Sequence, residues 1–324
     1  MIGLPFGDRR PRTADRRTRG QRSAVGRPGW RKPAWNGLHV GQAALPATCG
    51  ELFQGLLGDQ PCLVSCPIDW YSRACISLAP DGRGWRSRRP LPKTLAALSL
   101  AAARFDLPRA GWVEIESGLP SARGYGASTA DIGAALFALA CAAGATLHPA
   151  QAARLAVEVE PTDSTLFPGL ALFAHRDGGL CADLGRAPRL ALLVLDPGGQ
   201  VDTLAYNREV TPASLRRLAP AHREAYELLR AGLADGDWRT VGQGATLSAC
   251  AHQAVLFNPW LDAALDLSRA LDGVGVCRAH SGTILGLLLD PARTVPAEAC
   301  AQARQRLPAQ VAIRQHWLVD GGVR

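Results

Sequence analysis

The sequence has no long apolar run. No segment reaches the roughly 18 consecutive apolar residues of a membrane span, and no apolar signal core follows Met1. Hydrophobic residues nevertheless make up 47% of the 324 residues, which is enough for a sizeable core. We therefore predict a soluble, cytoplasmic protein without a membrane partner. Because one domain typically holds about 100–200 residues, we expect two packed units.

The sequence also has no CxxC motif. Its nine cysteines are an odd number, which suits free thiols in a reducing compartment better than a disulfide framework. Cys62 and Cys66 share an apolar stretch, but the seven scattered histidines offer no regular spacing for zinc ligation. We interpret these two cysteines as buried structural thiols.

Lysine is scarce, and the positive charge is concentrated near the N-terminus. Only two residues are lysines, and residues 1–38 contain ten of the 36 basic residues with only two acidic ones. That excess equals the net charge of +8 for the whole chain, so residues 39–324 are formally neutral. A neutral body has no broad electrostatic surface for phosphate backbones, which argues against a nucleic-acid partner.

Residues 1–38 are rich in Arg, Gly and Pro and poor in apolar residues. Such a segment cannot offset the entropy cost of ordering, so we predict a disordered basic arm. A mistaken upstream translation start would explain this arm without any function. An RNA-binding or targeting role is the alternative.

The remainder mixes strand-like and helix-like segments. Alternation of apolar and acidic residues over 113–116 indicates a half-buried strand, and a buried run over 188–196 ends in an Asp-Pro-Gly-Gly turn. Apolar segments broken by proline or glycine occupy 39–57 and 60–79, and further strands are expected at 283–289 and 310–318. Helices are predicted at 93–105, 131–143, 149–159, 212–234, 237–253, 259–271 and 296–306. These elements predict two mixed α/β halves, 39–188 and 189–324.

The most informative segment runs from Gly118 to residue 131, where a strand ends, a glycine-rich loop follows and a helix starts. Backbone N–H groups of such a loop and of the first helical turn form an anion site. Gly124 and Gly126 let a phosphate approach the backbone, and Ser128 and Thr129 place hydroxyls at the helix start. A capped helix after a tight turn is the alternative without function.

Two better-known phosphate loops do not fit this segment. A P-loop needs a glycine followed by Lys and Ser or Thr, whereas Arg123 precedes Gly124 here. A Rossmann fingerprint needs a third glycine three positions after Gly126, where Thr129 stands. The remaining pattern, Pro120-x-x-x-Gly-Tyr-Gly-Ala-Ser-Thr-Ala, closely resembles the nucleotide loop of the GHMP kinases.

Four other segments strengthen this resemblance. The stretches 46–55 and 64–71 look like the opening of the L-threonine kinases of cobalamin synthesis, a subgroup of the family. The stretch 279–286 looks like the family's third motif, and 159–164 (Val-Glu-Pro-Thr-Asp-Ser) also resembles the subgroup. Together these motifs span residues 43–289.

The resemblance implies an α+β fold. An N-terminal α/β domain of the ribosomal S5 domain 2 type would be followed by a C-terminal ferredoxin-like domain, with the active site between them. It also implies ATP and Mg²⁺ as cofactors and a small hydroxyl compound as substrate, with L-threonine the first choice. A kinase for homoserine or another small alcohol, or a GHMP-fold regulator that binds a ligand without catalysis, are the alternatives.

The resemblance also implies roles for individual residues. Ser128 and Glu160 would hold the metal. Glu158 is the alternative to Glu160, but two residues that are two positions apart on a helix face different ways, so only one of these glutamates can easily reach the metal. Asp163 would orient or deprotonate the substrate hydroxyl, unless it stabilises only its own turn. Arg123 would clamp a phosphate, unless it is a solvated loop residue. The predicted nucleotide contacts are Pro120, Ser121, Ala122, Arg123, Gly124, Tyr125, Gly126, Ala127, Ser128, Thr129, Ser281 and Gly282.

The substrate pocket is less well specified by the sequence. Glu51, Gln54 and Asp69 in the opening motifs are candidate polar contacts for an amino-acid substrate, or else structural residues. The pair at 280–281 resembles a nucleophile with its base, but no G-x-S-x-G elbow surrounds it, so we predict a structural turn. The stretch 175–177 (His-Arg-Asp) imitates a protein-kinase catalytic loop, but Ala182 stands where that loop needs Asn.

Overall fold

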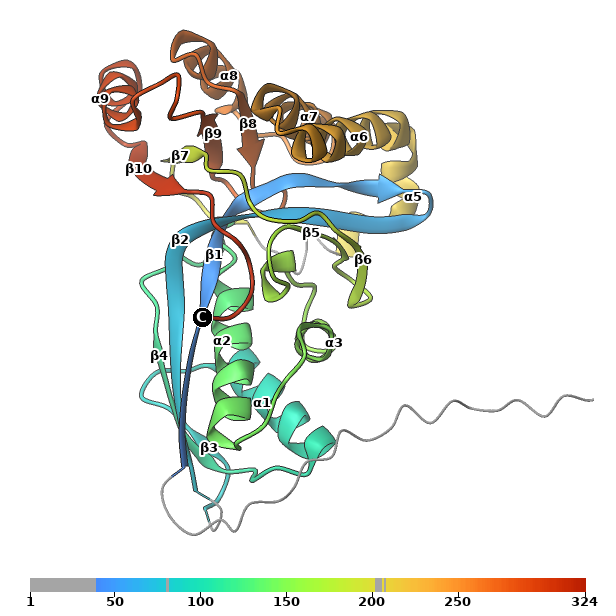
Figure 1. Cartoon of the computed structure of the whole chain (residues 1–324), viewed down its shortest axis with the longest axis vertical. Coiled ribbons are helices and arrows are strands. Elements are labelled where there is room, and N and C mark those ends of the chain that lie inside the picture. The colour runs from blue at the N-terminus through green and yellow to red at the C-terminus, as the bar shows by residue number, and fades with distance from the viewer. Residues whose placement is uncertain (1–38, 80–81, 202–205, 207) are drawn as a thin grey trace, which may run out of the picture. The chain divides into compact units, whose positions relative to one another are not determined.

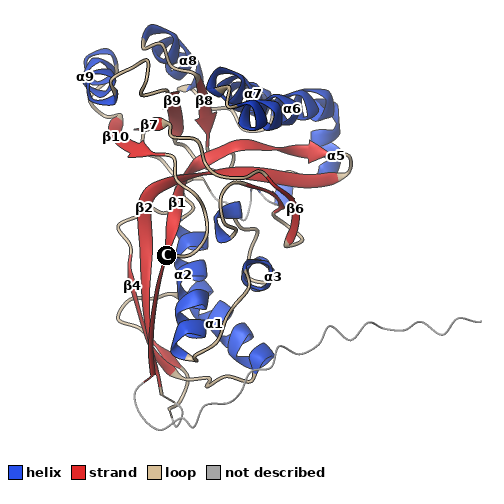
Figure 2. Cartoon of the chain, viewed as in Figure 1, coloured by secondary structure: helices blue, strands red, loops and turns tan. Residues whose placement is uncertain are grey.

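The computed structural model describes residues 39–79, 82–201, 206 and 208–324 (Figures 1 and 2). The predicted basic arm, residues 1–38, lies outside the described residues, so its disorder remains a prediction. Among the described residues, no helix combines the length and the apolar character needed to cross a membrane.

Two long antiparallel strands form the centre of the fold. β1 (His39–Leu57) pairs with β2 (Gln60–Leu78) along almost their whole length, and a tight turn joins them. The breaks expected at Pro46, Gly50 and Pro67 do not end the strands but coincide with register shifts between Pro46 and Phe53. Bulges of this kind bend a strand. Figure 1 shows β1 and β2 bending together. One end of this pair of strands lies beside α2 (Ala127–Ala142), and the other end lies beside α6 (Ala219–Asp235).

The first half of the fold packs helices on one face of the sheet. α2 is almost entirely buried and lies against β1 and β2. Close approach depends on Gly41, where an added Cβ would stand 2.2 Å from Ala138 O. The elements of this half are α1 (Pro92–Phe105), β3 (Trp85–Arg86), β4 (Gly111–Glu116), α2 (Ala127–Ala142), α3 (Pro149–Val157), β5 (Ala171–Ala174) and β6 (Gly179–Asp183).

The second half adds antiparallel strands to the same sheet, whose order is β10-β7-β9-β8-β1-β2-β4-β3. Figure 2 shows the helices of this half along one side of these strands. A single bonded pair, Glu51 with Arg278, joins β1 to β8. The elements are β7 (Ala191–Asp196), α5 (Pro212–Leu215), α6 (Ala219–Asp235), α7 (Trp238–Ala251), α8 (Leu261–Ala270), β8 (Gly275–Arg278), β9 (Leu285–Leu289), α9 (Pro296–Arg306) and β10 (Ala312–Trp317).

Most predicted elements are present, with two kinds of difference. The predicted helix 212–234 is divided into α5, a 3₁₀ turn at Arg216–Leu218 and α6, because Pro220 lies in the first turn of α6 and begins a new helix. The short strands β3, β5, β6 and β8 were not predicted. The predicted boundary near residue 188 falls between β6 and β7 and remains a prediction. Cys62 and Cys66 are buried free thiols, as predicted.

Candidate active site

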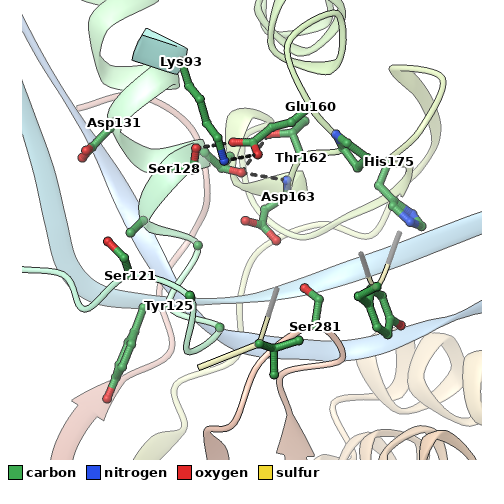
Figure 3. Close-up of a pocket in the computed structure, with 18 of the residues that line it drawn as sticks. Lys93, Ser121, Tyr125, Ser128, Asp131, Glu160, Thr162, Asp163, His175 and Ser281 are labelled. Carbon is green, nitrogen blue, oxygen red and sulfur yellow. Dashed lines mark hydrogen bonds and ion pairs between the residues drawn. The ribbon is translucent and has the colours of Figure 1, made fainter. Parts of the chain in front are cut away.

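A cavity of about 510 Å³ opens beside the glycine-rich loop (Figure 3). Its volume lies within the roughly 300–1,000 Å³ typical of small-molecule sites. Both halves of the chain contribute to its walls. The residues that line it are Glu51, Gln54, Leu63, Pro90, Leu91, Pro92, Lys93, Thr94, Pro120, Ser121, Ala122, Gly124, Tyr125, Gly126, Ala127, Ser128, Thr129, Asp131, Glu160, Pro161, Thr162, Asp163, His175, Val201, Tyr206 and Ser281.

The glycine-rich loop has a backbone shape that its sequence explains. Gly124 and Gly126 both have positive φ, 103° and 63°, which glycine adopts without strain. At Gly124 an added Cβ would also stand 2.0 Å from the Cβ of Ala279. The N–H groups of Thr48 and Gly50 donate to the carbonyls of Tyr125 and Gly124, which fixes the loop to β1. The loop is therefore preformed.

The N-terminus of α2 faces the cavity without a side-chain cap. Gly126 is the N-cap residue and has no side chain to accept from the first helical N–H groups. The residues that follow it, Ala127, Ser128 and Thr129, all line the cavity. Uncapped N–H groups at the start of a 16-residue helix are suited to binding an anion.

The predicted third motif supports the loop from behind. The N–H groups of Thr283 and Ile284 donate to Arg123 O at 2.9 and 3.1 Å. An added Cβ at Gly282 would lie 2.3 Å from the same oxygen, so glycine permits this contact. Ser281 lines the cavity, but Gly282 does not. Gly282 thus contacts the loop's backbone and has no contact with the cavity.

Arg123 forms an ion pair with a buried carboxylate, which neither alternative from the sequence (a phosphate clamp or a solvated loop residue) anticipated. Its Nη1 donates to both carboxylate oxygens of Asp196, at 3.1 and 3.0 Å, and the side chain does not line the cavity. Asp196 is fully buried and also accepts from Tyr125 and Arg314. A buried carboxylate needs such partners. The guanidinium therefore fixes the loop to the end of β7.

The predicted metal ligands lie side by side. Ser128 Oγ donates to Glu160 Oε1, and Lys93 Nζ donates to Glu160 Oε2 at 2.6 Å (Figure 3). A carboxylate and a hydroxyl oxygen at the start of α2 suit Mg²⁺, which takes one or two protein ligands and otherwise water and phosphate oxygens. Glu158 does not line the cavity. Its side chain is half exposed and forms an ion pair with Arg104 at 2.7 Å.

Asp163 lies half-buried beside the loop. Its N–H donates to Thr129 Oγ1 at 3.1 Å, and an added Cβ at Gly126 would lie 2.8 Å from its Oδ2. Burial, and then the carboxyl of Glu51, raises the pKa of Asp163 to about 7, although the hydrogen bond with Thr129 lowers it. Its side chain makes no capping bond to the following 3₁₀ turn, Ser164–Leu166. No such bond therefore supports the alternative that Asp163 only stabilises its own turn.

The three predicted substrate contacts have different surroundings. Glu51 lines the cavity and accepts from the N–H and the ring Nδ1 of His280, and burial raises its pKa to about 8. Gln54 also lines the cavity. Asp69 does not, because its Oδ1 accepts from His316 Nδ1 at 2.8 Å and from Trp317 N–H at 3.0 Å. Asp69 therefore lies outside the cavity and fixes the end of β10 to β2.

Several cavity residues were not predicted as site residues, among them Lys93, His175 and Tyr206. Lys93 was assigned only to a helix, although its rarity was a signal: it is one of two lysines in the chain. His175 was considered only as part of the 175–177 stretch that imitates a protein-kinase loop, and no pattern in the sequence marked Tyr206. His280 is fully buried in a structural position, as expected for the turn at 280–281.

Comparison with known proteins identifies the family. The model of the GHMP kinases N terminal domain matches residues 93–167, and that of the GHMP kinases C terminal domain matches residues 225–305. The chain belongs to the GHMP kinase family and is a phosphotransferase. The α+β fold expected from the motifs is thereby confirmed.

Two curated relatives match most of the chain. An L-threonine kinase of Salmonella typhimurium is 34% identical over 300 residues, which are 89% of this chain and 96% of the relative. An L-threonine kinase of Citrobacter freundii is 36% identical over 250 residues, 76% of this chain and 86% of the relative. The crystal structure of homoserine kinase from Cytophaga hutchinsonii matches with a TM-score of 0.70, covering 88% of this chain and 97% of its own. At 16% identity that likeness shows the fold alone.

Proposed function

We propose that the protein transfers the γ-phosphoryl group of ATP to the side-chain hydroxyl of L-threonine. The product, O-phospho-L-threonine, would serve the aminopropanol arm of cobalamin biosynthesis, in the cytoplasm where ATP is supplied. The observation that carries the proposal is the match to two L-threonine kinases over most of the chain. The composition of the cavity walls is consistent with it.

In this proposal the loop and the start of α2 hold the triphosphate. Their main-chain N–H groups supply the donors, and Lys93 adds a cation 2.6 Å from Glu160. Ser128 and Glu160 would hold Mg²⁺, which neutralises phosphate charge when bound. In the described part of the chain, no three His, Cys, Asp or Glu side chains group into a metal site. Phosphate oxygens and water would therefore complete the coordination.

Asp163 acts on the acceptor. The threonine hydroxyl oxygen forms the new bond to phosphorus as the bond between the γ-phosphorus and ADP breaks, and the hydroxyl proton goes to the carboxylate of Asp163. A pKa raised to about 7 makes this carboxylate a better base than an ordinary Asp, while it is still largely ionised slightly above neutrality. In-line positioning of the hydroxyl contributes beside the proton transfer.

Two acidic side chains, those of Glu51 and Asp163, line the part of the cavity where the acceptor would bind. The negative charge of Glu51 contributes to the raised pKa of Asp163. A substrate ammonium group between them would relieve this repulsion and favour both ionised forms. An amino acid with a hydroxyl side chain therefore suits the cavity better than a neutral alcohol.

An ADP-release assay over a panel of acceptors tests the proposal. The panel holds L-threonine, L-serine, L-homoserine and neutral alcohols, and ³¹P NMR identifies the product. We expect kcat/KM for L-threonine to exceed that for every other acceptor by about tenfold or more, the scale of one well-placed methyl or hydroxyl. A preference for homoserine would overturn the substrate, and no acceptor-dependent ADP release would overturn the activity.

Two variants control for contaminating kinases. Ser128→Ala should lose most of the activity, because Ser128 lies at the proposed phosphate and metal site. Asp69→Asn should keep it, because Asp69 lies outside the cavity. Equal activity in all preparations would show that the measured ADP release comes from another enzyme.

A further inference from the structure

One histidine in the cavity wall has an unusual environment. His175 directly follows β5 and is 4% exposed, and it lines the cavity. Within the described residues, neither Nδ1 nor Nε2 has a hydrogen-bond partner. Buried polar atoms are almost always paired, so a buried imidazole with two unpaired nitrogens in the wall of a cavity points to a ligand.

The backbone places His175 next to the reacting centre. Thr162 N–H donates to the carbonyl of His175 at 3.2 Å, which joins the end of β5 to the segment that carries Asp163. Figure 3 shows Asp163 between Ser128 and His175, with Ser281 nearby. His175 therefore lies on the acceptor side of Asp163, away from the proposed metal ligands.

The imidazole is neutral. Burial, together with the charge of Arg176, lowers the pKa of His175 to about 3. A neutral ring offers one N–H donor and one acceptor, and it is too weak a base to remove a hydroxyl proton at neutral pH. The part it can play is that of a fixed hydrogen-bonding group.

The charges around the cavity indicate which substrate group it meets. A zwitterionic amino acid brings an ammonium and a carboxylate, and the carboxyls of Glu51 and Asp163 suit only the ammonium. The carboxylate needs donors away from both. His175 provides an N–H, and Arg176 beside it contributes positive charge to the same region.

We propose that His175 is a substrate-binding residue that donates its ring N–H to the α-carboxylate of the acceptor amino acid. This inference rests on the proposed function, because it requires an acceptor that carries a carboxylate. It assigns His175 to specificity for amino acids over simple amino alcohols, and not to proton transfer.

The test combines a variant with a truncated substrate. His175→Leu removes the donor, whereas His175→Asn keeps one. The acceptors are L-threonine and (R)-1-amino-2-propanol, which is threonine without its carboxylate. We expect His175→Leu to raise KM for L-threonine by about tenfold or more, the effect of losing a hydrogen bond to a charged group, with KM for ATP unchanged. For the amino alcohol, the KM, or the Ki against threonine, should be the same in variant and wild type.

Other outcomes separate the inference from the proposed function. His175→Asn should recover part of the lost affinity for threonine, and its melting temperature checks folding if the Leu variant is unstable. Equal losses for both acceptors, or no loss for threonine, would overturn the role of His175. If wild type prefers L-homoserine, the proposed substrate is wrong. The role of His175 can then be tested with L-homoserine and 3-amino-1-propanol, which is homoserine without its carboxylate. A preference for acceptors without a carboxylate would overturn both.

Discussion

At the scale of single residues, two carboxyls set the charge of the cavity: that of Glu51, which is buried, and that of Asp163, which is half-buried. Asp163 and Glu51 have pKa values raised to about 7 and about 8, mainly by burial. Neither meets a cation in the described structure close enough to cancel this effect. A positive group that binds nearby would therefore lower the pKa of each carboxyl and favour its ionised form. Substrate binding is thus coupled to the charge of the proposed base.

The first residue-scale prediction concerns turnover. Asp163→Asn removes the proton acceptor but keeps the size of the side chain, so kcat should fall by about 10²- to 10⁴-fold, the range of general-base contributions. KM for ATP should change little, because the nucleotide site is formed by the loop and α2. Steady-state kinetics with both substrates measures this, with Asp69→Asn as the matched control. Unchanged turnover in a folded Asp163→Asn protein removes this residue from the mechanism.

The second prediction concerns stability against pH. An Asp has a pKa near 3.9 in an unfolded chain, so the folded protein binds the Asp163 proton more tightly. This contribution to stability is present below about pH 4 and is lost as pH rises through about 7. Asp163→Asn cannot ionise, so its melting temperature should exceed that of wild type at pH 8 by several degrees.

The comparison across pH makes this prediction specific. The difference between the two melting temperatures should shrink toward pH 5, where the wild-type carboxyl is protonated. A variant that is less stable than wild type by the same amount at pH 5 and pH 8 would show that the Asp163 carboxyl is not held out of water as described. Differential scanning calorimetry at both pH values gives the answer.

At the scale of elements, the phosphate loop depends on contacts that are distant in sequence. Its glycines and the helix start were recognisable because they form a local pattern within twelve residues of Gly118. The pairing of Arg123 with Asp196, and the bonds from the 283–284 segment, join residues more than 70 positions apart. No local pattern records such pairings, so sequence reasoning left the side chain of Arg123 undecided.

A glycine substitution tests this support of the loop. Gly282→Ala would put a Cβ 2.3 Å from Arg123 O, so the turn and the loop must separate. Since misplacing phosphate-binding groups by about 1 Å can cost 10²-fold, we expect kcat/KM for ATP to fall roughly 10- to 100-fold. Gly118→Ala is the control, because its Cβ would lie 3.7 Å from Trp70, an ordinary contact. Equal kinetics in the two variants would refute a supporting role for the 281–284 turn.

At the scale of the whole molecule, both halves of the chain build the cavity. Ser281 and Tyr206 come from the second half, and the loop, Glu160 and Asp163 from the first. The long helices and the main strands were predictable because each contains a long apolar segment. The strands β5 and β8 were not, since four residues carry too little pattern, and His175 was missed together with β5.

The N-terminal residues give a whole-molecule prediction. Residues 39–324 are formally neutral, and the described residues that line the cavity all fall within this range. A protein lacking residues 1–38 should therefore keep its kcat, both KM values and its melting temperature, while its isoelectric point falls because an excess charge of +8 is removed. Loss of activity in the shortened, folded protein would show that the N-terminal residues take part in the reaction.

The central claim is that main-chain N–H groups of the loop and the start of α2 bind the triphosphate. A crystal structure with Mg²⁺ and a nonhydrolysable ATP analogue tests it most directly. We predict the β- and γ-phosphates against the amides of residues 124–129, with the metal on Ser128 and Glu160. A triphosphate bound elsewhere in the cavity, or a metal that contacts neither side chain, would contradict the account.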